Sequence, residues 1–108
     1  MVTATIALTR YDEPNWLLWQ ALESIAGQRG VEGAVLVLDQ TEDGDTADNC
    51  ASLSVPGLPF KWLGIAARSL SYARNQAIAI ARFPIILFID ADATAEPDWA
   101  HELAATFS

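Results

Sequence analysis

The sequence contains few of the residues that build disulfide frameworks, zinc sites or nucleic-acid surfaces. Its 108 residues include one cysteine, Cys50, and one histidine, His101. An intramolecular disulfide and a zinc site with four cysteine or histidine ligands are therefore excluded. Basic residues are also scarce, with six Lys and Arg against 14 Asp and Glu, which gives a formal net charge of -8. Because nucleic-acid phosphates bind positively charged surfaces, this composition argues against a nucleic-acid partner.

Long apolar runs and targeting patterns are missing as well. Continuous apolar stretches such as 85–89 remain far below the roughly 20 residues that a membrane-spanning helix needs. The first residues lack the basic, apolar and small-residue pattern of a signal peptide. We therefore expect a cytoplasmic protein without a transmembrane segment. The hydrophobic content of 52% is nevertheless sufficient for a core, and the length predicts a single domain over residues 1–108.

The spacing of apolar residues predicts strands that alternate with helices. Strands are expected over 3–8, 34–38, 60–63 and 85–89, and helices over 14–26, 70–81 and from 96 onward, with a short helix within 45–51. Such alternation favours right-handed crossovers and a mostly parallel α/β sheet. Ligands of these sheets bind beyond the carboxyl ends of the strands. The loop 9–13, Asp39 and the Asp90-Ala91-Asp92 segment are expected at those ends, so they are the candidate site.

Proline, glycine and serine residues mark the expected helix ends. Pro14 suits the first helical position, where a missing N–H costs nothing, and Gly27 ends the same pattern. Ser69 or Ser71 is the expected cap of the helix over 70–81, and Pro84 stops that helix.

Two common phosphate-binding motifs are absent. Neither a G-x-G-x-x-G sequence after the first strand nor a P-loop motif occurs, so a phosphate ligand would need a cation or the arginines. Asp90 and Asp92 follow a buried strand and can share a hard cation, Mn²⁺ or Mg²⁺, which prefers oxygen ligands and bridges to phosphates. Such an ion acts as a Lewis acid toward a phosphate leaving group. The alternative is a pair of solvated loop acids.

Several motifs in a fixed order point to one family. In chain order they are Thr9-Arg10-Tyr11-Asp12-Glu13-Pro14, Leu36-Val37-Leu38-Asp39, Ser71-Tyr72-Ala73-Arg74-Asn75-Gln76-Ala77-Ile78, Leu87-Phe88-Ile89-Asp90-Ala91-Asp92 and Pro97-Asp98-Trp99. From Thr5 to about Leu103 the chain resembles the nucleotide-binding half of glycosyltransferase family 2. The resemblance implies a GT-A-like, Rossmann-like α/β fold with helices flanking a mostly parallel sheet, in truncated form. It also implies an inverting, metal-dependent enzyme with a nucleotide-sugar donor, most often UDP-linked.

The same resemblance assigns residues to the nucleobase side of the site. Tyr11 would stack on the base, and Asp39 would accept a hydrogen bond from the base imino group or from the ribose. Glu13 matches a common acid of this loop, although it also suits a helix N-cap. Two positions depart from the family pattern: Asp12 stands where asparagine is usual, and Gln40 replaces a second aspartate. These departures leave the base and sugar open.

The phosphate side of the site is assigned in the same way. Arg68 and Arg74 would face the base or the phosphates. Asp92 would be the direct ligand of Mn²⁺ or Mg²⁺, and Asp90 would reach the ribose or metal-bound water. The carboxylate that deprotonates the acceptor lies in the second half of family domains, and no residue here is assigned to it. An apolar edge or face that the second half would cover is expected to cause self-association.

Two other functions fit parts of the sequence. Residues 86–94 also resemble the first motif of haloacid-dehalogenase-like phosphatases, in which Asp90 would be the nucleophile and Asp92 the general acid and base. That motif normally opens its domain, and its required lysine would have to follow, whereas no lysine follows Thr94. A non-catalytic nucleotide-binding or interaction module is the other alternative, because no catalytic base is assigned.

Overall fold

The computed structural model describes residues 1–41, 47, 49–66 and 69–107. In this part of the chain, four parallel strands form one sheet in the order β3-β2-β1-β4. The strands are β1 (Val2–Arg10), β2 (Val31–Asp39), β3 (Phe60–Gly64) and β4 (Ile86–Asp90). The helices are α1 (Asn15–Ala26), α3 (Leu70–Ile80) and α4 (Trp99–Ala105), and Ala51–Leu53 forms a single 3-10 turn, η1. The predicted parallel α/β fold is confirmed.

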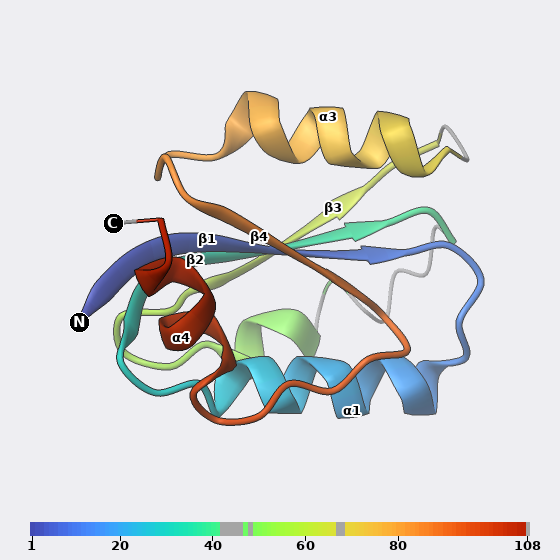
Figure 1. The fold of residues 1–108 in the computed structure, drawn as a ribbon. Coiled ribbons are helices and arrows are strands. Elements are labelled where there is room, and N and C mark those ends of the chain that lie inside the picture. The colour runs from blue at the N-terminus through green and yellow to red at the C-terminus, as the bar shows by residue number, and fades with distance from the viewer. Residues whose placement is uncertain (42–46, 48, 67–68, 108) are drawn as a thin grey trace.

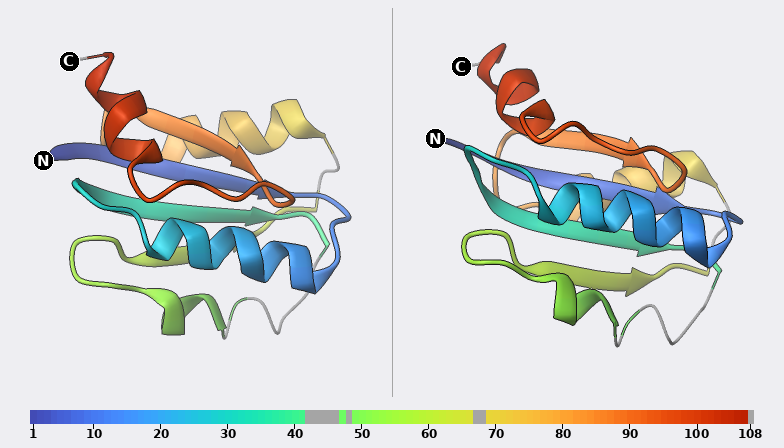
Figure 2. Two further views of the ribbon diagram at one scale, coloured as in Figure 1. Left: turned by 60° about the horizontal axis from the view of Figure 1, so that its bottom comes forward. Right: turned by 90° about the horizontal axis from the view of Figure 1, so that it is seen from below.

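Helices cover both faces of the sheet. Helix α3 lies on one face, and α1, η1 and α4 lie on the other (Figures 1 and 2). Along β1, Ile6 and Leu8 pack on the α1 face with Leu18 and Leu22 of α1. The intervening Ala7 belongs to a smaller cluster on the α3 face, which also contains Leu36, Leu38, Ile65, Ala73 and Ala77. Because the sheet is buried on both faces, its central strands are continuous apolar runs rather than alternating ones.

Strands β1 and β2 extend further than the apolar runs predict. Thr9 and Arg10 pair with Leu38 and Asp39 of β2, so the expected loop 9–13 begins only at Tyr11. Backbone hydrogen bonds carry a strand through polar residues when the neighbouring strand continues beside it. A short helix is expected within 45–51: residues 47, 49 and 50 are helical and Ala51 begins η1, whereas 45, 46 and 48 lie outside the described residues.

The helix ends agree in part with the predicted caps. Gly27 ends α1, as predicted, but Pro14 is its N-cap, in an extended conformation, rather than its first helical residue. Ser69 caps α3, because its Oγ accepts a hydrogen bond from the Tyr72 N–H at 3.1 Å. Helix α3 ends at Ile80, before the predicted stop at Pro84.

None of the helices in the described part of the chain combines the length and the apolar character that a membrane crossing requires.

Candidate functional site

A cleft of about 360 Å³ lies at the carboxyl ends of the strands. The residues that line it come from the ends of three strands, from the loop after β1 and from the first turn of α3: Thr9, Tyr11, Glu13, Gln40, Leu70 and Asp90. This volume is within the roughly 300–1,000 Å³ that is usual for small-molecule sites. The structure thus brings together three predicted site residues, Tyr11, Glu13 and Asp90. From the sequence, Thr9 is expected only as part of the loop 9–13 and Gln40 only as a departure from the family pattern, and Leu70 is not expected at the site.

The register of the sheet places Asp39 and Asp90, which the sequence assigns to one site, on opposite faces of the sheet. Thr9 pairs with Asp90, whereas the next residue, Arg10, pairs with Asp39. Successive side chains of a strand point to opposite faces. Thr9 therefore shares the α3 face with Ala7, and Arg10 and Asp39 point to the α1 face. Asp39 is fully buried and does not line the cleft.

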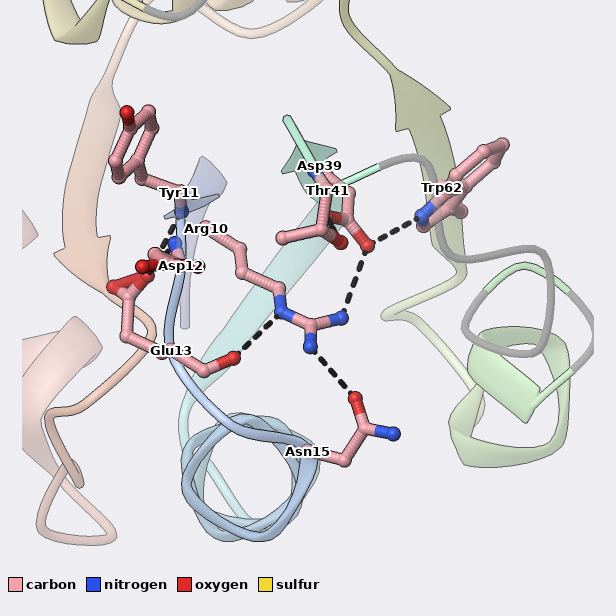
Figure 3. Close-up of polar contacts among 8 residues, drawn as sticks. All are labelled: Arg10, Tyr11, Asp12, Glu13, Asn15, Asp39, Thr41 and Trp62. Carbon is pink, nitrogen blue, oxygen red and sulfur yellow. Dashed lines mark hydrogen bonds and ion pairs between the residues drawn. The ribbon is translucent and has the colours of Figure 1, made fainter.

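The carboxylate of Asp39 is the centre of a buried hydrogen-bond network (Figure 3). Its Oδ2 accepts from Arg10 Nη1 at 3.3 Å and from Trp62 Nε1 at 3.1 Å. Its Oδ1 accepts from the Thr41 backbone N–H at 2.9 Å and from the Thr41 hydroxyl at 2.5 Å. Buried carboxylates require such partners because their desolvation is costly. The contact predicted between Asp39 and a ligand stays a prediction, and it would have to displace one of these donors.

Arg10 links this network to the loop that carries Tyr11. Its Nε donates to the Glu13 carbonyl at 3.0 Å, and its Nη2 donates to Asn15 Oδ1 at 2.6 Å. One guanidinium therefore holds the end of β2, the loop 11–14 and the start of α1 (Figure 3). The sequence reasoning gave Arg10 no role. The sequence signal for this ion pair is an arginine at the end of one strand and an aspartate at the end of the adjacent strand.

The carboxylate of Glu13 organises the loop and does not cap the helix. Its Oε1 accepts from the backbone N–H of Tyr11 at 2.8 Å and of Asp12 at 3.0 Å. The N-cap position of α1 belongs to Pro14, so the N-cap interpretation of Glu13 is wrong. The loop therefore presents Tyr11 on a fixed backbone. The Tyr11 side chain is 51% exposed, and Figure 3 shows its ring pointing away from Arg10.

Asp90 and Asp92 stand at the end of β4 as two exposed carboxylates. The Ala91 N–H donates to the Thr9 carbonyl at 3.1 Å, and the Ala93 N–H donates to the Asp90 carbonyl at 3.0 Å, which closes a turn. Neither carboxylate has a hydrogen-bond or ion-pair partner among the described residues, and Asp92 does not line the cleft. Two unpaired carboxylates fit a hard cation that takes its other ligands from water and phosphate. The described residues include no group of three or more His, Cys, Asp or Glu side chains that could complete a metal site.

Of the two predicted arginines, Arg74 lies among the described residues and Arg68 does not. The Arg74 guanidinium lies over the Phe88 ring, 5.5 Å from its centroid, and so contacts the strand that ends in Asp90. Arg74 itself is exposed and does not line the cleft. Arg68 lies outside the described residues.

Two solved structures that share this fold are much longer than this chain. Residues 1–349 of S. aureus TarS superpose with a TM-score of 0.74 at 21% identity, over 95% of this chain and 31% of that TarS chain. A mannosyltransferase from Pyrobaculum calidifontis, in complex with GDP-Man and Mn²⁺, gives a TM-score of 0.72 at 24% identity, over 95% of this chain and 31% of that one. TarS structures also exist in complex with UDP and with UDP-GlcNAc. These likenesses confirm the predicted GT-A fold, and the chain spans about a third of the length of these two solved chains.

Sequence comparison supplies the family. No curated protein sequence matches the chain. The model of the glycosyl transferase family 2, in contrast, matches residues 5–108. Because this match covers nearly the whole chain, the protein belongs to glycosyl transferase family 2 and carries a glycosyltransferase domain.

Proposed function

We propose that this chain binds the donor of an inverting glycosyltransferase, which moves a sugar from a nucleoside-diphosphate sugar to a hydroxyl acceptor. The observation that carries the proposal is the cleft, which brings Tyr11, Gln40 and Asp90 to one edge of the sheet. This edge is where parallel α/β sheets bind their ligands. UDP and UDP-GlcNAc are ligands of S. aureus TarS, so a UDP-sugar is the donor that we propose first.

Tyr11 and Glu13 would form the nucleobase wall. An aromatic ring that is 51% exposed at a cleft offers a flat surface on which a base can stack. Glu13 binds two amides of its own loop through Oε1, and no donor from the described residues reaches its Oε2. In this proposal the second oxygen accepts from a donor group of the ligand.

Gln40 would read the polar edge of the base. Its side chain is 3% exposed and lines the cleft, and its Oε1 is buried without a hydrogen-bond partner among the described residues. Buried acceptors without a partner are rare, because a buried polar group that forms no hydrogen bond costs about 1–3 kcal/mol. A primary amide offers one acceptor beside two donors, which complements the imino N–H and carbonyl of uracil. Because Asp39 already accepts four hydrogen bonds, we assign recognition of the base to Gln40 rather than to Asp39.

Asp90 and Asp92 would hold the divalent cation, Mn²⁺ or Mg²⁺. The P. calidifontis mannosyltransferase was solved with Mn²⁺, and the two unpaired carboxylates here suit the same class of ion. When bound, the ion would neutralise negative charge on the diphosphate leaving group. Asp90, at the end of β4, would hold the ion or the ribose from within the cleft, and Asp92 would be the direct ligand from the following turn. Arg74 and Arg68 remain proposed partners of the phosphates.

The proposed site binds the sugar donor and does not include a site for the hydroxyl acceptor. Direct displacement at the anomeric carbon requires a base for the acceptor hydroxyl. We assign that base to none of the described residues, and we propose donor binding, rather than turnover, for these 108 residues. No specific observation favours the phosphatase or the non-catalytic alternative over the family assignment.

Three sequence-based expectations stay predictions. The first two are a cytoplasmic location and a single domain over residues 1–108. Self-association is the third, and the described strands leave the outer edge of β4 without a partner strand. Exposed strand edges pair readily with other chains. Light scattering at rising concentration measures this directly, and a mass equal to one chain throughout would contradict it.

Calorimetric titration with UDP tests the donor site. We expect binding in MnCl₂ or MgCl₂ and at least about tenfold weaker binding in EDTA, which corresponds to about 1.4 kcal/mol. Asp92→Asn should produce the same loss with metal present, whereas Glu23→Gln, which removes an exposed acid from α1, should bind like the parent chain. UDP binding that ignores both the metal and Asp92, or no binding at all, would overturn the proposal.

A further inference from the structure

A second cavity lies at the opposite end of α3 from the cleft. It measures about 430 Å³ and lies between the amino-terminal half of the sheet and the last residues of α3. Its apolar lining is formed by Ala34, Leu36, Pro59, Ile80 and Phe83. Volume and lining are those of a small-molecule pocket, which is typically apolar with a few polar groups. The cleft proposed for the nucleotide sugar uses none of these residues.

Two unpaired cations line this cavity. Arg10 and Arg29 each form an ion pair with an aspartate, and Arg74 lies over an aromatic ring. Lys61 and Arg82 have no acidic partner in the described part of the chain, and both line the second cavity. Two cationic side chains without a carboxylate partner at one cavity are unusual in a chain whose net charge is -8. The site therefore favours a negatively charged ligand.

The end of α3 does not cancel this positive charge. Its last carbonyls carry the equivalent of about half a negative charge, because the helix dipole ends there. Two full positive charges therefore leave a net positive potential at the mouth of the cavity.

The floor of the cavity contains a polar group that the fold leaves unsatisfied. Thr5 lies on β1 beside Ala34 of β2 and is 1% exposed. Its Oγ1 has no hydrogen-bond partner among the described residues. Native structures contain few such groups. A ligand bound in the cavity would supply the missing hydrogen-bond partner of this hydroxyl.

We infer that this cavity binds a small amphipathic anion, that is, a carboxylate or phosphate group on a short apolar chain. The head group would lie near Lys61 and Arg82, and the apolar chain would lie against Leu36 and Ile80. Apolar contact supplies the affinity, and the two cations select the charge.

Nuclear magnetic resonance titration of the ¹⁵N-labelled chain tests this inference. We expect octanoate to shift the amide signals of Thr5, Ala34 and Ile80, and acetate and octanol to bind about tenfold more weakly, since each lacks one half of the ligand. Octyl phosphate is the arm that distinguishes the head groups, and tighter binding than octanoate would assign the site to phosphate. Equal binding of octanol and octanoate, or shifts centred elsewhere, would overturn the inference.

Variants separate the site from unspecific binding. The double variant Lys61→Met with Arg82→Met should bind octanoate roughly tenfold more weakly, because two partly solvated charge interactions are lost. Arg29→Gln removes an exposed cation elsewhere and should bind like the parent chain. Thr5→Val should raise the thermal midpoint and weaken octanoate binding. A double variant that keeps both its dispersed spectrum and its full affinity would refute the inference, whereas UDP binding should be unchanged in every variant.

Discussion

The guanidinium of Arg10 and the carboxylate of Asp39 form an ion pair with an Nη1–Oδ2 distance of 3.3 Å and side-chain exposures of 6% and 0%. Arg10 also holds the loop backbone and Asn15, so the pair joins the core to the loop that carries Tyr11. A buried ion pair contributes little net stability compared with apolar residues, but breaking it is costly. The pair therefore fixes the conformation of the site rather than forming its surface.

Arg10→Met is expected to destabilise the chain by about 3–5 kcal/mol, because the carboxylate of Asp39 would stay buried without its cation. Urea unfolding followed by circular dichroism measures the loss. Arg29→Gln is the matched control. Its pair with Asp98 has side-chain exposures of 69% and 51%, and an exposed pair is worth about 0–1 kcal/mol. Equal effects of the two substitutions would show that the buried network does not hold the loop.

Cys50 is expected to be an unreactive thiol. Burial and, to a smaller extent, the charge of Asp39 raise the pKa of its thiol from its usual value of 9.0 to about 11. The thiol therefore stays protonated at pH 8, and the disulfide reagent DTNB should label the folded chain far more slowly than the urea-unfolded chain. Rapid labelling of the folded chain would contradict this protonation state.

The same shift of the Cys50 pKa predicts a dependence of stability on pH. The thiol loses its proton near pH 9 in the unfolded chain and near pH 11 in the folded chain. The free energy of unfolding is therefore unaffected by this thiol below pH 9 and falls as the pH rises toward about 11. Other groups also titrate in this range, so the comparison must be with Cys50→Ala. The parent chain should lose more of its unfolding free energy between pH 9 and 11 than the variant does, and parallel curves would contradict this account.

Tyr11→Ala is expected to weaken UDP binding by roughly 1–3 kcal/mol, the usual contribution of one base stacked on an aromatic ring. Tyr11→Phe keeps the ring and should keep most of the affinity. The two variants share an exposed position, so neither is expected to change the unfolding midpoint. Calorimetric titration with UDP measures both, and a loss in the Phe variant as large as in the Ala variant would assign the effect to the hydroxyl.

The sequence allows the elements and the site edge to be predicted, because these depend on local patterns. Apolar runs mark the strands, helical spacing marks α1 and α3, and alternation of the two implies parallel strands with a site at their carboxyl ends. Tyr11 and Asp90 are placed in the cleft by this reasoning alone. The caps are less certain from sequence, since Ser69 and Ser71 differ only in where the helix begins.

The face to which each site residue points cannot be predicted in this way. It depends on the strand register, and a shift by one residue reverses every side chain. Thr9 looks like a loop residue in the sequence, yet it pairs with Asp90 within the sheet and lines the cleft. Asp39 looks like a ligand residue, yet two of its four hydrogen bonds come from Arg10 and Trp62, which are distant in sequence. Long-range contacts therefore decide the role of the acid.

Gln40 offers the last prediction, because Gln40, rather than Asp39, lines the cleft. Gln40→Leu removes the hydrogen bonds while keeping much of the volume, and it should weaken UDP binding by about 1–2 kcal/mol. N3-methyl-UDP lacks the imino proton, so it should bind the parent chain more weakly by a similar amount. The two losses should not add, since both remove the same contact.

A double-mutant cycle of calorimetric titrations checks this expectation. The four Kd values come from the parent chain and Gln40→Leu, each with UDP and with the methylated nucleotide. A methyl effect that persists in full in Gln40→Leu would assign the imino proton to another acceptor. Tyr11→Ala serves as the control, because it should weaken both nucleotides equally and leave the methyl effect unchanged. If the methyl effect disappears in Gln40→Leu alone, the residue after Asp39 is the one that recognises the base.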